Sequence, residues 1–80
     1  MTAIKNENEV NKMTTDDLTR TIKKFTAANG RGPKNLHELQ EAVAAELNTA
    51  VSEAELLDEL EKAEKDFFVG KNNDGNFVVL

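Results

Sequence analysis

A change in apolar spacing near residue 67 constrains the fold of this chain more than any other feature. Before that point, large apolar residues recur three and four positions apart, which is the spacing of one helix face. After it, two aromatic and β-branched runs, Phe67-Phe68-Val69 and Phe77-Val78-Val79-Leu80, enclose Asn72-Asn73-Asp74-Gly75. Asp-Gly between apolar runs is the strongest short signal for a β-hairpin. The sequence therefore predicts helices followed by a two-stranded ribbon.

Three helices are predicted ahead of the ribbon, over residues 15–29, 36–47 and 53–66. Each follows a residue that can accept hydrogen bonds from the first amides of a helix: a threonine of Thr14-Thr15, Asn35 and Ser52. Glu38 and Glu55 stand where they would complete capping boxes in the second and third helices. The apolar stripes are Leu18, Ile22 and Phe25; Leu36, Leu39, Val43 and Leu47; and Leu56, Leu60, Ala63 and Phe67.

The register of the ribbon depends on the length of its turn. A two-residue turn at Asp74-Gly75 needs positive φ at both residues. It would place Asn73 opposite Asn76, Lys71 opposite Val78 and Val69 opposite Leu80. The additional asparagines also permit a longer loop. In addition, the turn at residues 30–33 could add one bridge to an edge of the sheet.

These elements predict an α+β fold of three helices followed by a C-terminal two-stranded antiparallel hairpin. The pattern from Ser52 to Leu80, Ser-Glu-x-Glu-Leu-Leu-x-x-Leu-Glu-Lys followed by a strand and Asp74-Gly75, resembles the third helix and wing of winged-helix proteins. The resemblance covers residues 15–80 in pattern and element order. The alternative is a three-helix bundle with a hairpin flap. Residues 1–13 are expected to be a flexible tail, and residues 14–80 a single domain.

Composition excludes several kinds of site. The chain has no cysteine and one histidine, so disulfides, zinc–thiolate sites and multi-histidine metal sites are impossible. No apolar run approaches the roughly 20 residues that span a bilayer, and the first residues lack the apolar core of a signal peptide. The only histidine, His37, has no neighbouring nucleophile. We expect a cytoplasmic protein that is not an enzyme and uses no cofactor, metal or membrane.

Charge is divided unevenly along the chain. Residues 1–34 carry seven basic and four acidic side chains, whereas residues 35–80 carry three basic and eleven acidic ones. No acid lies between Leu18 and His37, where five basic residues occur: Arg20, Lys23, Lys24, Arg31 and Lys34. This basic stretch is a candidate surface for an anion such as nucleic acid. The alternative is a solvated helix face with no ligand.

The third predicted helix has the opposite charge. Its exposed positions include a candidate acidic partner surface: Glu55, Asp58, Glu59 and Asp66. Winged-helix proteins that read DNA insert this helix into the major groove, where phosphates would repel an acidic helix. We therefore expect a non-enzymatic interaction or regulatory module that binds another protein or a second copy of itself. The alternative is a DNA-binding regulator that uses the stretch from Arg20 to Lys34.

Overall fold

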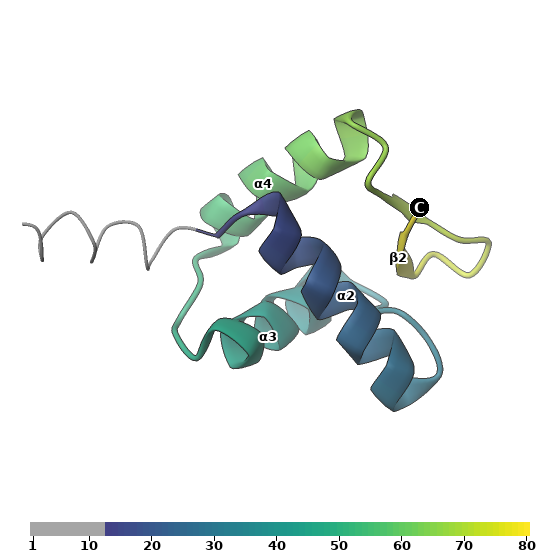
Figure 1. The fold of residues 1–80 in the computed structure, drawn as a ribbon, viewed down its shortest axis with the longest axis horizontal. Helices are drawn as coiled ribbons and strands as arrows, with labels where there is room; N and C mark the ends of the chain where they lie inside the picture. The colour runs from purple at the N-terminus through teal and green to yellow at the C-terminus, as the bar shows by residue number, and fades with distance from the viewer. Residues whose placement is uncertain (1–12) are drawn as a thin grey trace, which may run out of the picture.

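The computed structural model of the protein describes residues 13–80, in which three helices precede a hairpin (Figure 1). The elements are α2 (Thr15–Asn29), α3 (Leu36–Leu47), α4 (Glu53–Lys65), β1 (Val69–Lys71) and β2 (Phe77–Val79). The two strands pair antiparallel in a two-stranded sheet. The α+β fold class and the element order are confirmed. Most of the expected tail, residues 1–12, lies outside the described residues.

The helix starts lie where the capping residues predict them. Thr14 and Asp17 form a reciprocal capping box at the start of α2, and the side chains of Asn35 and Ser52 accept hydrogen bonds from amides in α3 and α4. Gly30 follows α2 at φ 75°, the left-handed conformation expected for it. Because these signals are local, the sequence places all three helix starts correctly.

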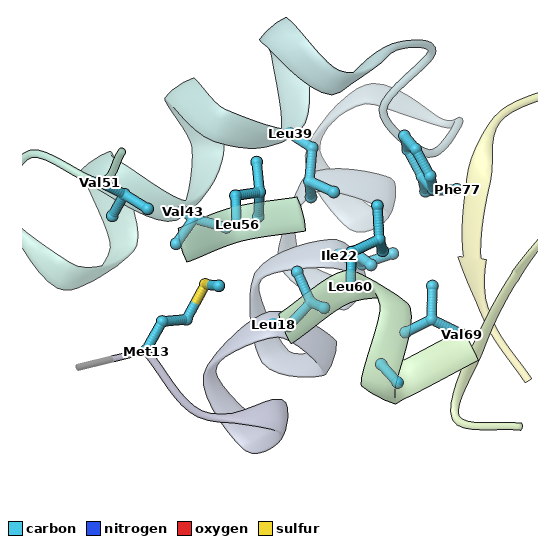
Figure 2. Close-up of a cluster of buried hydrophobic side chains, with 11 residues drawn as sticks. Met13, Leu18, Ile22, Leu39, Val43, Val51, Leu56, Leu60, Val69 and Phe77 are labelled. Carbon is cyan, nitrogen blue, oxygen red and sulfur yellow. The ribbon is translucent and has the colours of Figure 1, made fainter. Parts of the chain in front are cut away.

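The core lies between the three helices and the inner face of the hairpin (Figure 2). Figure 2 shows apolar side chains from α2, α4 and the strands pointing toward one another, with Ile22 and Leu60 near its centre. Helix α2 packs against α3, α4 and β2, while α4 also packs against β1. The buried apolar residues are Met13, Leu18, Ile22, Leu39, Val43, Val51, Leu56, Leu60, Ala63, Val69 and Phe77.

Met13 belongs to this core, although the expected tail included it. Its side chain is 3% exposed and lies on the side of the core that Val43 and Val51 also line (Figure 2). Burying one methionine side chain stabilises a fold by about 1.5–3 kcal/mol. Among the described residues, the packed core therefore includes residue 13 as well as residues from 14 onward.

The end of α4 differs from the prediction. The helix ends at Lys65, and Phe67, expected on the buried stripe, has φ 64° and is 78% exposed. The Phe68 amide donates to the Ala63 carbonyl, and the Phe67 amide donates to the Glu64 carbonyl. These two bonds form a Schellman motif, in which the left-handed residue is usually glycine. Phe67 occupies that position and is turned away from the core.

The hairpin register also differs from the prediction. Val69 pairs with Val79, Gly70 with Val78 and Lys71 with Phe77. Only Gly75 takes positive φ in the turn, because the Asn72 side chain closes a longer loop. Its Oδ1 accepts from the amides of Asp74 and Asn76, each at 3.0 Å. A shift of one residue moves every side chain of a strand to the opposite face, so Val79 is paired with the buried Val69 where Leu80 was expected.

The segment before α3 lies against the outer edge of β2. The Phe77 amide donates to the Pro33 carbonyl at 2.8 Å. A Cβ atom on Gly32 would lie 1.9 Å from the Phe77 carbonyl oxygen, so only glycine fits there without movement of the backbone. The predicted bridge to the sheet edge does not form: the segment contributes one backbone hydrogen bond, and the sheet remains two-stranded.

Two leucines on α4 test the assignment of the core. Leu60 is buried and Leu57 is 46% exposed. Leu60→Ala is expected to lower the free energy of unfolding by about 2–5 kcal/mol, because it removes buried methyl groups and leaves a cavity. Leu57→Ala, the matched control on the same helix, should change it by about 0.5 kcal/mol or less. Urea titration measures both, and equal effects would contradict this packing.

Candidate functional site

The basic stretch is largely paired with acids from α3. The Arg20 guanidinium contacts Asp17 at 2.6 Å and Glu46 at 2.9 Å, and the Lys24 ammonium contacts Glu46 at 3.1 Å. Hydrogen bonds from Arg20 and then Lys24 lower the pKa of the Glu46 carboxyl. Helix α3 thus supplies the negative charge that the sequence lacks between residues 18 and 37.

Arg31 is paired in the same way at the start of α3. Its guanidinium contacts Glu38 at 3.0 Å, and the Glu38 carboxylate also accepts from the Lys34 amide at 3.0 Å. Among the described residues, the expected bonds from the Asn35 amide to Glu38 and from the Ser52 amide to Glu55 are both absent, so these two capping boxes were wrongly predicted. Hydrogen bonds from Arg31 and the Lys34 amide lower the pKa of Glu38 to about 2.

Two members of the basic stretch differ from the other three. The side chains of Lys23 and Lys34 make no ion pair within residues 13–80. The five predicted basic residues are therefore not one free positive surface. Sequence reasoning missed the pairing with Glu46 because that residue lies 26 positions from Arg20 and 22 positions from Lys24.

The predicted acidic surface on α4 is also divided. Asp58 contacts Lys62 at 3.6 Å, and Glu59 accepts a hydrogen bond from the Thr15 hydroxyl of α2 at 2.7 Å. Glu55 and Asp66 are exposed near opposite ends of the helix. Glu59 therefore connects α4 to α2, and the other three acids remain available to solvent.

The residues that form an apolar surface on the hairpin were not predicted. We define the hairpin face as Phe68, Gly70, Val78 and Leu80, which share the side of the sheet opposite Val69 and Phe77. Phe68 is 50% exposed and Leu80 67% exposed. Gly70 has no side chain, and the Leu80 methyl groups lie within 3.2 Å of where its Cβ would be. The register error hid this surface, because it paired Leu80 with the buried Val69.

A groove adjoins the hairpin face. It has a volume of about 540 Å³ and lies between residues 78–80 and four residues of α2: Ile22, Lys23, Thr26 and Ala27. Its lining is mostly apolar, and Lys23 is the charged residue among those that line it. Grooves of about 300–1,000 Å³ are large enough for a ligand or a peptide side chain.

Two other kinds of feature, metal sites and membrane-spanning helices, are absent from the described part of the chain. Within residues 13–80, no group of three His, Asp or Glu side chains could hold a metal ion. None of the helices in this part of the chain has the length and apolar character that crossing a membrane requires. Comparison of the chain with models of protein families, with curated proteins and with solved structures found no match.

The Arg31–Glu38 pair predicts a pH dependence of stability. Because folding lowers the pKa of Glu38 from 4.5 to about 2, its contribution is present above pH 4.5 and is lost as the pH falls toward 2. Glu38→Gln should therefore be less stable than the wild type at pH 6, and this difference should close near pH 2. Thermal unfolding from pH 6 to pH 2 measures it.

Glu61→Gln is the matched control for this experiment. Glu61 is an exposed glutamate that makes no ion pair within residues 13–80. Its variant should follow the wild-type pH dependence. A difference between Glu38→Gln and the wild type that stays constant with pH would contradict the assigned role of the pair.

Proposed function

We propose that this protein is a non-enzymatic interaction module that binds another protein through the hairpin face together with Phe67. The conformation of Phe67 carries the proposal. Its φ of 64° is the left-handed conformation, which is unfavourable for an aromatic residue. Such a conformation costs on the order of 1–3 kcal/mol, and the Schellman motif at this position would be satisfied by glycine.

Burial of the Phe67 ring does not offset the cost of its left-handed conformation. The Phe67 ring gains little from burial, because the side chain is 78% exposed. Residues held in strained conformations tend to occur at functional sites. An aromatic side chain that is both strained and exposed is well suited to the centre of a binding surface, since aromatic residues supply much of the energy of protein interfaces.

The neighbouring residues extend this surface. Phe68 follows Phe67 directly in the chain. The Leu80 amide donates to the Phe68 carbonyl at 2.9 Å, which keeps Leu80 beside Phe68. Contiguous exposed apolar residues in a small, highly charged chain are typical of interaction sites. This supports binding at the hairpin, which is the wing in the winged-helix interpretation.

The alternative function, DNA binding by the basic stretch, has weaker support. Arg20, Lys24 and Arg31 are engaged with carboxylates, and binding phosphates would require those pairs to break. The acids of α4 would also repel a duplex. The winged-helix resemblance therefore remains a prediction about element order and does not by itself favour DNA as the partner.

The variant Phe67→Gly separates the effect of Phe67 on the stability of the fold from its effect on the affinity for a partner. Glycine removes the cost of the left-handed conformation, so the free energy of unfolding should rise by about 1 kcal/mol. The same change removes the exposed ring and should weaken binding by about tenfold. Urea titration measures the first effect, and peptides selected from a random displayed library against the full wild-type chain measure the second.

Two further variants control the binding measurement. Phe68→Ser should also lose the selected peptides, whereas Leu57→Ser, which alters an exposed leucine of α4, should retain them. Selected peptides that bind all variants equally would contradict the proposal. So would binding of a mixed-sequence DNA duplex tighter than about 10 μM near 0.15 M salt that Lys23→Glu and Lys24→Glu abolish, because salt-sensitive binding through basic residues is typical of DNA-binding proteins.

A further inference from the structure

The outer edge of β2 is only partly covered. The Phe77 amide points away from β1, since it donates to Pro33, whereas the Leu80 amide points toward β1 and donates to Phe68. Backbone groups along a strand alternate between its two sides. The amide and carbonyl of Val79 therefore face away from β1, and the Val79 amide has no acceptor within residues 13–80.

The open part of the edge adjoins the groove. Val79 lines it from the hairpin, and Ile22, Thr26 and Ala27 line it from α2. An unpaired strand edge is a template for a further strand. A chain paired with Val79 would place alternate side chains against the apolar wall of α2, which is how peptides that extend a sheet gain specificity.

Charge indicates what kind of peptide fits. Lys23 is the charged residue of the groove, and its ammonium makes no ion pair within residues 13–80. The neighbouring Arg20 and Lys24 already contact Glu46. A ligand that carries a carboxylate beside an apolar residue would pair with Lys23 while its apolar side chain enters the groove.

We infer that the groove binds an extended acidic and apolar segment of another protein, which adds to the sheet as a third strand beside Val79. The inference rests on the proposed function and specifies how the partner is recognised. A second copy of this chain fits less well, because its β2 edge would bring a second Lys23 to the same groove, where the two ammonium groups would repel each other.

Three short capped peptides test this mode of binding. The first alternates valine and glutamate, the second has lysine in place of glutamate, and the third repeats the first with alternate backbone nitrogens methylated so that they cannot donate. Fluorescence anisotropy with the full chain should show the acidic peptide binding about tenfold more tightly than either of the others at low salt. Hydrogen exchange of the Val79 amide should slow about tenfold when the acidic peptide is bound.

Charge reversal tests whether Lys23 is the residue that distinguishes the acidic peptide from the lysine peptide. Lys23→Glu should reverse the preference between the acidic and the lysine peptides. Lys62→Glu makes the same change in net charge on α4, where Lys62 lies beside Asp58, and should leave the preference unchanged. Equal effects of the two variants would overturn the inference, because the preference would then follow net charge alone.

The remaining outcomes distinguish this inference from the proposed function. Peptides that depend on Phe67 and Phe68 but neither protect the Val79 amide nor respond to Lys23→Glu would overturn the inference and leave the proposed function intact. Protection of the Val79 amide that rises with protein concentration, without peptide, would also overturn it, since the occupant would be a second copy. Selected peptides whose affinity is unchanged by Phe67→Gly and by Phe68→Ser would overturn the proposed function instead.

Discussion

Burial of one side of α2 is the constraint on which the other elements depend. Leu18 and Ile22 are almost fully buried, and α2 contacts α3, α4 and β2 along its length. A two-stranded hairpin alone is marginally stable in water, so β1 and β2 need the helices to cover their inner face. Helix α2 also forms one wall of the groove. The packing that holds the fold together therefore also fixes the position of the proposed binding surface.

The ion pairs of α3 determine which charges this surface presents. Glu46 contacts Arg20 and Lys24 together, and Glu38 contacts Arg31. Exposed pairs of this kind contribute little to stability, typically about 0–1 kcal/mol. They also neutralise three cations of α2 and of the turn before α3, and within residues 13–80 Lys23 at the groove is left without an ion pair. The stretch from Arg20 to Lys34, which is basic in sequence, thus contributes one localised positive charge to the groove, that of Lys23.

Features set by neighbouring residues could be predicted from the sequence, and features set by distant contacts could not. The helix starts follow from Thr14, Asn35 and Ser52, each of which bonds an amide within its own first turn. The hairpin register depends on two hydrogen bonds to the Asn72 side chain that compete with the two-residue turn. The left-handed Phe67 could not be foreseen, because no glycine marks the end of α4. The pairing of Glu46 with α2 joins residues more than 20 positions apart.

The contact between Gly32 and Phe77 has a consequence for how the chain behaves at high concentration. The Gly32–Pro33 segment occupies the β2 edge at Phe77, and proline cannot donate a hydrogen bond to a further strand. On the outer side of β2, an incoming strand therefore meets an open edge only around Val79. Continuous stacking of strands, as in amyloid fibrils, needs a long uninterrupted edge. On this side of the hairpin, the segment before α3 thus leaves room for a short added strand but not for a long, continuous edge-to-edge pairing.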